Sequence, residues 1–283
     1  MVRSRVILAT LAALILGGAS WYLIRPVTAA DLLAALPSGA APTLYVNVKV
    51  LRAAGLLEKF AGPATLEDPE YKRFVSATGF DYRRDLDAVV IVSRPGDTLM
   101  VVAGAFDLAR LAMYAKANGG RCAGELCSVQ GSTAERQISW TPLRRRVLGL
   151  AVSPDPMAAT LLAGNTTRPD FPLPGGPVWV HVPGLALRPG AGLPPGLSAL
   201  LSALEGAQYA QLSASVAEIT LVAPCPTQEK AAVLAARLTE TTQTLRNLLV
   251  REKSQPNALA GTLAGGEFRA DATTLRGRWP LKW

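Results

Sequence analysis

The sequence predicts an α+β protein: an N-terminal transmembrane helix followed by two similar α+β units with mainly antiparallel sheets. Three observations predict this class: one long uncharged segment near the start, short apolar strands separated by turn residues, and helices with recognisable capping residues. The 283 residues, 49% of them hydrophobic, suffice for about two domains of ordinary size. Only 18% of the residues are charged, which excludes a disordered acidic tail or a histone-like arm.

The uncharged segment runs from Val6 to Ile24. At ~1.5 Å per helical residue it spans roughly 28 Å, close to the ~30 Å hydrocarbon core of a bilayer. Arg3 and Arg5 precede it, and the positive-inside tendency therefore keeps the N-terminus in the cytoplasm. We expect a single-pass inner-membrane protein whose bulk is periplasmic or otherwise extracytoplasmic.

A cleaved signal peptide is the competing interpretation of the same segment. Its apolar region would be Val6 to Leu16, with a small-residue cleavage site near Ala19 or Ala29. The length of the run and its bulky end favour an uncleaved anchor. No cysteine lies near either site, so the sequence excludes a lipoprotein. A secreted form would also place the bulk of the chain outside the cytoplasm.

The chain divides into four parts on composition. Residues 1–29 are the cytoplasmic tip and the anchor or signal segment, 30–165 the first α+β unit, 166–177 a proline-rich linker and 178–283 the second α+β unit. Eight prolines lie between Arg168 and Gly196, which is typical of a stiff, extended connector.

In the first unit, turn and capping residues separate the elements. Asp68 and Pro69 predict the start of a helix that ends near Gly79, and Asp107 predicts another that ends at Gly119. Arg94 to Asp97 predicts the turn of a hairpin. The expected helices are 30–36, 51–60, 69–78, 108–118 and 156–162, and the expected strands are 43–51, 88–93, 98–103, 147–152 and short segments around Cys127 and Ile138.

The second unit repeats this order of elements. A helix from Thr227 has an apolar face with a 3.6-residue period, which includes Ala231, Leu234 and Leu238. The other expected elements are a helix at 197–204, strands at 178–182, 209–215 and 218–222, and a closing hairpin at 266–272 and 274–279. The recurrence of strand, helix, hairpin and helix predicts a duplicated arrangement.

Four stretches carry a resemblance to a known family. They are TLYVNVKVLRAAGLLEKF (43–60), DPEYKRFVSATGFDYRRDLDAVVIV (68–92), VVAGAFDLARL (101–111) and TTLRGRWPLKW (273–283). The chain resembles uncharacterised bacterial single-pass envelope proteins classed as a domain of unknown function. The resemblance implies one N-terminal membrane segment and an exported α+β region. It implies no known activity and carries over no functional residues.

Cys122 and Cys127 are the candidate disulfide. An exported chain meets oxidising conditions, and the four residues between the two cysteines include a glycine that allows a turn. Cys225 is about a hundred residues away and should stay unpaired. Two reduced, buried cysteines and a redox-active pair are the alternatives. The three cysteines and the single histidine lack the paired spacings of a structural zinc site.

Two further groups of polar residues are possible catalytic or metal sites. His181 lies in a strand beside Trp179, with no nucleophile motif near it in the sequence, so we interpret it as a structural residue. Asp81, Asp85 and Asp87 match no calcium-loop spacing, and the neighbouring arginines predict surface ion pairs that fix the loop before a strand. The sequence therefore assigns no catalytic residue, cofactor or metal ligand.

Arg136, Arg144, Arg145 and Arg146 form a candidate anion-contact patch. Outside the inner membrane its partner would be an anionic polymer of the cell wall, a lipid headgroup or an acidic envelope protein. The net charge of +8 includes three arginines that flank the membrane segment, so nucleic acid is not expected as a partner. Adjacent arginines need an exposed or edge strand, and charges that protect such an edge from aggregation are the alternative explanation.

The leading functional hypothesis is a non-enzymatic, membrane-anchored envelope protein with a binding or scaffolding role. One alternative is a hydrolase or transferase that uses carboxylates distant in sequence, such as Asp85 or Glu218. The other is a carrier of an apolar ligand beneath the long amphipathic helix.

Overall fold

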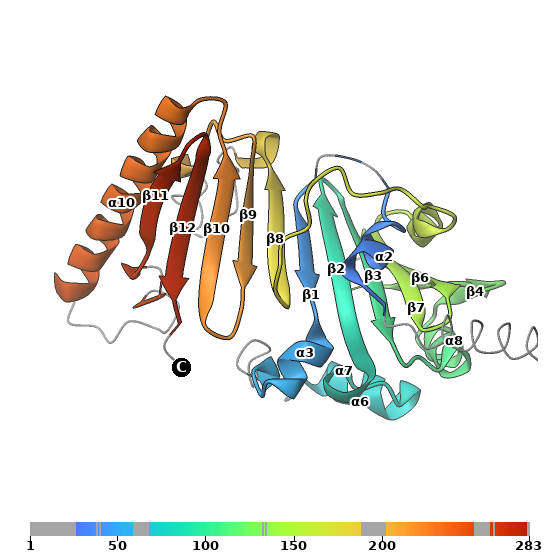
Figure 1. Ribbon diagram of the computed structural model, residues 1–283. Helices are drawn as coiled ribbons and strands as arrows, with labels where there is room; N and C mark the ends of the chain where they lie inside the picture. The colour runs from blue at the N-terminus through green and yellow to red at the C-terminus, as the bar shows by residue number, and fades with distance from the viewer. Residues whose placement is uncertain are drawn as a thin grey trace, which may run out of the picture.

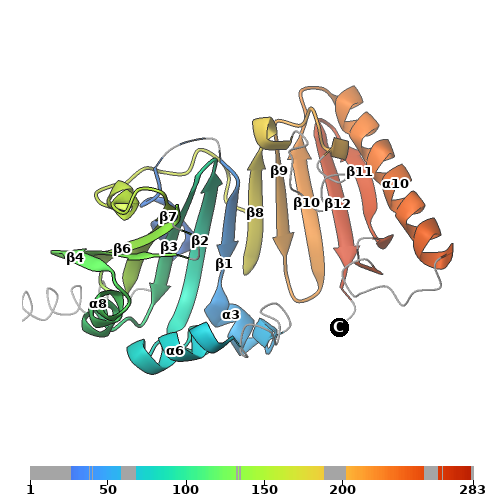
Figure 2. The same ribbon diagram turned by 180° about the vertical axis from the view of Figure 1, so that it is seen from behind.

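The structure is a computed structural model, and it describes residues 27–37, 39, 41–58, 68–131, 133, 135–187, 202–251, 261–262 and 264–281. One sheet of twelve strands runs through the described chain, with α10 at one end and the β4 hairpin at the other (Figures 1 and 2). The expected α+β class with mainly antiparallel sheets is confirmed. The expected anchor, Val6 to Ile24, lies outside the described residues. Within the part of the chain that is described, no helix is long and apolar enough to span a membrane.

The strand order of the sheet is β11-β12-β10-β9-β8-β1-β2-β3-β7-β6-β5-β4, and every neighbouring pair is antiparallel. The two halves meet where β1 pairs with β8, with Tyr45 opposite Trp179. These two rings stack with their centroids 5.3 Å apart. Backbone hydrogen bonds therefore continue through the junction and join both halves into one sheet.

The first half contains seven strands and most of the helices of the described chain. Its strands are β1 (Thr43–Val46), β2 (Leu86–Arg94), β3 (Asp97–Gly104), β4 (Arg121–Ala123), β5 (Leu126–Gln130), β6 (Gln137–Arg144) and β7 (Val147–Ser153). Its helices are α2 (Ala29–Leu33), α3 (Val48–Ala53), α6 (Pro69–Thr78), α7 (Tyr82–Asp85), α8 (Leu108–Ala117) and the 3₁₀ helix η1 (Ala158–Leu162).

In its described residues, the second half contains five strands and one long helix. Its strands are β8 (Val178–Pro183), β9 (Tyr209–Ala214), β10 (Glu218–Pro224), β11 (Glu267–Asp271) and β12 (Thr274–Pro280). Its helices are the 3₁₀ helix η2 (Gly184–Leu187) and α10 (Gln228–Arg251). Most of the helix expected at 197–204 lies outside the described residues.

The two halves share one order of pairing. In the first, β1, β2, β3, β7 and β6 are successive neighbours, and α8 follows β3. In the second, β8, β9, β10, β12 and β11 are successive neighbours, and α10 follows β10. By this order α8 corresponds to α10, β7 to β12 and β6 to β11.

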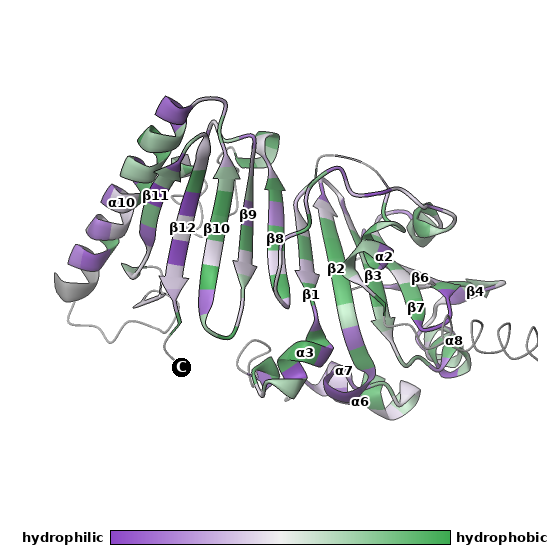
Figure 3. Ribbon diagram, in the orientation of Figure 1, coloured by the Kyte–Doolittle hydropathy of each residue, from purple (hydrophilic) through white to green (hydrophobic). Residues whose placement is uncertain are grey.

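The sheet has two faces, because alternate residues of a strand point to opposite sides. We call face one the side that carries Val90 and Val101, and face two the side that carries Val89 and Val102. On the first half, α2 and η1 cover face one and bury a core that includes Leu32 and Leu162. On the second half, α10 covers face two and buries Leu221. Figure 3 shows the hydropathy of each residue: β2 is apolar along most of its length, whereas strongly polar and less polar residues alternate along β12.

Local sequence signals explain the ends of several elements. Asp68 accepts a hydrogen bond from the backbone N–H of Glu70 and Pro69 occupies the first turn, so α6 begins where it was predicted. It ends at Gly79, whose φ of 74° is left-handed and suits glycine. Asp107 caps α8 by accepting from the N–H of Arg110. The hairpins β2–β3, β9–β10 and β11–β12 also lie where they were expected.

The predicted strand over 43–51 was wrong beyond its first residues. Asn47 interrupts it, because its side chain accepts a hydrogen bond from the N–H of Val50 and begins α3. The alternation of Leu44, Val46, Val48 and Val50 with polar residues also predicts that these four form the buried face, which is wrong, since Tyr45 between them is buried at 5% exposure. The alternating pattern misled because it continued into the helix, whose Val48 and Leu51 pack in a separate small core. The helix expected at 51–60 begins earlier, as α3.

Candidate functional site

The site of greatest interest lies on face two of the first half, where α6 and α8 cover the sheet only in part. An apolar groove of about 760 Å³ runs between these helices and strands β2, β3, β5, β6 and β7. We call it the apolar groove. Its lining comprises Glu70, Arg73, Phe74, Phe80, Leu86, Val89, Val102, Phe106, Leu111, Tyr114, Asn118, Val129, Gln130, Gly131, Ile138, Trp140, Leu148 and Leu150.

The floor of the groove consists of strand residues that no helix covers completely. Val89, Val102, Ile138 and Leu150 are all half-buried, although they lie in the interior strands of the sheet. Trp140 and Leu148 are more deeply buried, because Leu111 and Ala115 of α8 pack on them. An apolar surface that stays in contact with water in the interior strands of a sheet is a candidate binding site.

Aromatic rings form one wall of the groove. Phe74 of α6 meets the ring of Tyr114 edge to face, with the centroids 5.2 Å apart. Phe80 stacks on Phe106 at 5.0 Å and lies 6.3 Å from Phe74. These contacts join α6, the residues after it and the start of α8 into one aromatic wall.

Asp81, which follows the aromatic residue Phe80, joins the helix α6 to the start of α7. Its carboxylate accepts hydrogen bonds from the Tyr71 hydroxyl at 2.9 Å and from the Arg83 side chain, whose Nη2 lies 2.7 Å from Oδ2. The Arg83 hydrogen bond is the main reason why the pKa of Asp81 falls to about 2. Burial and the Asp81 carboxylate raise the pKa of Tyr71 to about 12. Arg84 pairs with Asp85 at 2.8 Å, so the predicted ion pairs before β2 are present.

The alternative of converging carboxylates finds no support at its two named residues. Asp85 precedes β2 and pairs with Arg84, whereas Glu218 begins β10 and pairs with Arg278. Strands β1, β8 and β9 lie between β2 and β10, which separates the two by about 19 Å or more at ~4.8 Å per strand. Among the described residues, no group of three or more His, Cys, Asp or Glu side chains lies close enough to hold a metal ion.

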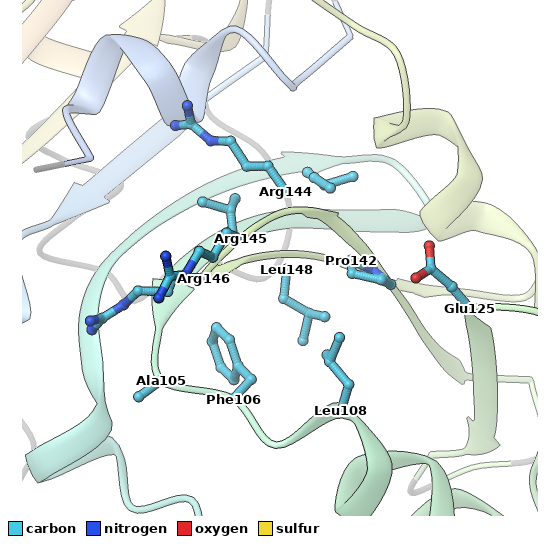
Figure 4. Close-up of a pocket in the computed structure, with 11 residues that line it drawn as sticks. Ala105, Phe106, Leu108, Glu125, Pro142, Arg144, Arg145, Arg146 and Leu148 are labelled. Carbon is cyan, nitrogen blue, oxygen red and sulfur yellow. The ribbon is translucent and has the colours of Figure 1, made fainter. Parts of the chain in front are cut away.

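A second cavity of about 750 Å³ adjoins the apolar groove and shares Phe106 and Leu148 with it. Figure 4 shows Phe106, Leu108, Leu148 and Pro142 around its hollow, with Glu125 on the side away from the arginines. Arg144, Arg145 and Arg146 line this cavity at the tight turn between β6 and β7.

The structure does not bring the predicted anion-contact patch together. Arg136 precedes β6 and Arg144 ends it, so the eight residues of the strand separate the two by roughly 26 Å. Arg146 pairs with Asp87 at 2.9 Å, and Arg144 points away from Arg145 and Arg146 (Figure 4). All three arginines are exposed, as expected, but β6 and β7 are interior strands: Arg144 ends β6, and Arg145 and Arg146 form the hairpin turn to β7. Arg146 has a φ of 63° there, which is unusual for a residue with a side chain.

Cys122 and Cys127 lie directly opposite each other in β4 and β5 and are joined by a disulfide. The Cα atoms are 4.0 Å apart. Sγ of Cys122 also lies 4.0 Å from the carbonyl oxygen of Ala112, so the bridged hairpin supports α8 from below. Cys225 is a buried free thiol in the second half, and burial raises its pKa.

His181 lies at the junction of the two halves, on face one. Its ring stacks on Phe171 of the proline-rich linker, with the centroids 3.8 Å apart, and its Nδ1 lies 3.3 Å from Nε2 of Gln211. The same Gln211 nitrogen donates to the carbonyl oxygen of Pro172 at 2.7 Å. Burial lowers the pKa of His181, so the ring is neutral at pH 7 and serves to hold the linker on the sheet.

Comparisons with known proteins yield only distant similarities. No protein-family model and no curated protein matches the chain. Crystal form I of TP0453 is similar with a TM-score of 0.49 and 12% identity, covering 89% of this chain and 93% of that one. Crystal form III gives 0.47 and 12% over 88% and 93%, and crystal form IV gives 0.40 and 14% over 89% and 94%. No residue role follows from these matches.

Sequence reasoning missed the apolar groove. One of its alternative hypotheses placed an apolar ligand beneath the long helix, where α10 packs on the core of the second half. The available signal was the difference in length between the helix after Asp107 and the helix after Thr227, which are 10 and 24 residues long. This difference in length indicates an uncovered surface only once both helices are known to lie on the same face of one sheet.

Proposed function

We propose that the protein is a binding protein, held at the inner membrane by Val6 to Ile24, which docks a partner of the cell envelope in the apolar groove. The observation that carries this proposal is the half-buried floor of Val89, Val102, Ile138 and Leu150 in interior strands. Covering such a surface gains about 25 cal/mol per Å² of apolar area removed from water. The aromatic wall around Phe74 gives the groove a fixed shape, which favours specific binding over general stickiness.

A photo-crosslinking experiment tests the proposal in cells that make the full chain. Tyr114 lines the groove and is replaced by p-benzoylphenylalanine. The matched control places the same group at Tyr209 of β9, a half-buried tyrosine in the other half. Irradiation should give a discrete adduct from position 114 and none from position 209.

Val102→Phe then asks whether the adduct depends on the groove. Val102 lines the floor, and the larger side chain should fill space there and lower the yield about tenfold, the loss expected for one apolar anchor. Val222→Phe in β10 changes a half-buried valine outside the groove and should leave the yield unchanged. An adduct that is insensitive to Val102→Phe, or equal adducts from both tyrosine positions, would contradict the proposal.

An apolar ligand with an acidic head is the second candidate. The cavity below the β6–β7 turn favours it, because Arg145 borders that cavity and the cavity shares Phe106 and Leu148 with the groove. An adduct at position 114 that adds only the mass of a small apolar molecule would support this candidate.

A further inference from the structure

We propose that the partner element bound in the apolar groove is an amphipathic helix, which lies across face two of the first half in the place that α10 takes in the second. The inference rests on the proposed function and names its partner. It follows from the repeated strand order. In the second half, the helix α10 covers the part of face two that corresponds to the groove.

The packing of α10 on the second half shows which kind of helix fits this surface. Ala231, Leu234, Ala235 and Leu238 are at most 8% exposed and pack on face two, where Leu221 and Leu275 are almost fully buried. The small alanines let the helix approach the strands, and the leucines fill the spaces between the strand side chains. This pairing of small and large residues at i, i+3, i+4 and i+7 describes the face of a helix that fits such a surface.

The equivalent helix in the first half cannot cover the same ground. α8 ends at Ala117, and the N–H of Gly120 returns to the carbonyl oxygen of Ala115 at 2.8 Å, which turns the chain away. The helix packs partly on the β4–β5 hairpin, where Cys127 joins its core. The strands that correspond to the seat of α10 therefore keep a half-buried apolar surface.

The dimensions of that surface suit a helix. Its floor crosses β2, β3, β7 and β6, which at ~4.8 Å per strand is about 14 Å wide. A helix with its side chains is ~10–12 Å across, whereas a single acyl chain would leave much of this width open. The groove of about 760 Å³ would receive the apolar side chains of the helix, while its polar side faces water.

The charges around the groove agree with an amphipathic helix. Glu70 and Arg73 lie 3.8 Å apart on α6 and neutralise each other, and the remaining polar lining is the uncharged Asn118, Gln130 and Tyr114. The lining of the groove therefore carries no net charge. The recognition element is thus an apolar face of alanine and leucine or aromatic residues, presented by another protein of the envelope.

A display experiment on the full chain in nanodiscs tests this inference. The library presents 18-residue helices built on residues 228–245, with the positions of Ala231, Leu234, Ala235 and Leu238 varied among apolar residues. A control library of the same composition places those apolar residues at alternate positions, which removes the helical face. The helical library should yield binders and the control library none.

The variants Val102→Phe and Val222→Phe test whether the selected helices bind in the apolar groove. Selected helices should bind the Val102→Phe chain about tenfold more weakly and the Val222→Phe chain unchanged. Helices that bind both variants alike, or equal yields from the two libraries, overturn the inference. A small-molecule adduct at position 114 that Val102→Phe abolishes, with no helix selected, overturns the helix and leaves the groove as a binding site. Failure of both experiments removes the proposed function as well.

Discussion

The two halves of the sheet carry equivalent helices on the same face, yet one helix closes a core and the other leaves a groove. α10 has 24 residues and covers face two so completely that Leu275 of β12 is fully buried. α8 has 10 residues, and Leu150 of the equivalent strand β7 is only half-buried. The difference shows that one strand order can close a core or leave a groove, according to the length of a single helix.

The first half has a disulfide and a hydrogen-bonded carboxylate near its short helix. A disulfide joins the two strands of the hairpin that packs on α8, and the hydrogen bonds of Asp81 join α6 to the start of α7. The described part of the second half has no disulfide, and the long helix provides the packing there. The groove therefore lies between elements that these contacts hold in place.

The difference in packing between the two halves is tested most directly by replacing one leucine of face two in each half by alanine. Leu275→Ala in β12 should lower the free energy of unfolding by about 3 kcal/mol, since it opens a cavity in a closed core. Leu150→Ala in β7 should cost about 1 kcal/mol, because its side chain already contacts water. Chemical denaturation measures both values. Equal costs would mean that the groove is as tightly packed as the second core.

Removal of the disulfide should have the next largest effect. Cys122→Ser with Cys127→Ser should cost about 2 kcal/mol, the value expected for a six-residue ring in the chain-entropy model. Hydrogen exchange should increase in β4, β5 and α8, because Cys122 lies against Ala112 of that helix. Exchange in α10 should stay unchanged and serves as the internal control. A uniform increase across both helices would show that the bridge holds the whole fold rather than one wall.

The carboxylate behind the aromatic wall should have the smallest effect. Asp81→Asn should destabilise the protein by about 1 kcal/mol at pH 7, because asparagine can still cap α7 but has no charge to pair with the partly exposed Arg83. The folded pKa of Asp81, about 2, lies below its unfolded value, so this stabilisation is complete above about pH 4 and is lost as the pH falls towards 2. Denaturation of both proteins at several pH values measures the difference.

Asp155→Asn is the matched control for that experiment, since Asp155 is exposed and caps only the turn at Met157. Its effect should be smaller than that of Asp81→Asn at pH 7. A difference between wild type and Asp81→Asn that persists unchanged at pH 2 would contradict the assigned role of the Arg83 pair.

Local elements could be predicted from the sequence because their signals lie within a few residues. Asp68 with Pro69 marks the start of α6, Gly79 its end, and Asp107 the start of α8, and all three act through contacts inside one or two turns. The same reasoning failed at Asn47, where an alternating pattern continued while the side chain began a helix. Two local signals competed there, and only packing decided between them.

The candidate site could not be predicted in the same way. Arg136 and Arg144 are only eight positions apart in the sequence, but the extended strand between them places them at opposite ends of β6. Val89, Val102, Ile138 and Leu150 look like ordinary core residues of four strands, since exposure depends on what covers them and not on their own side chains. No local pattern distinguishes a covered valine from an uncovered one.

The sequence by itself determined the hairpins, the capped helices, the amphipathic face of α10 and the spacing of Cys122 and Cys127, because each of these depends on neighbours in the chain. Only the tertiary structure decided that β1 pairs with β8, so that two halves share one sheet, and that α8 and α10 lie on the same face of it. Those features depend on contacts between residues far apart in the sequence. The apolar groove exists because a helix that is sufficient locally is too short for the surface that distant strands assemble beneath it.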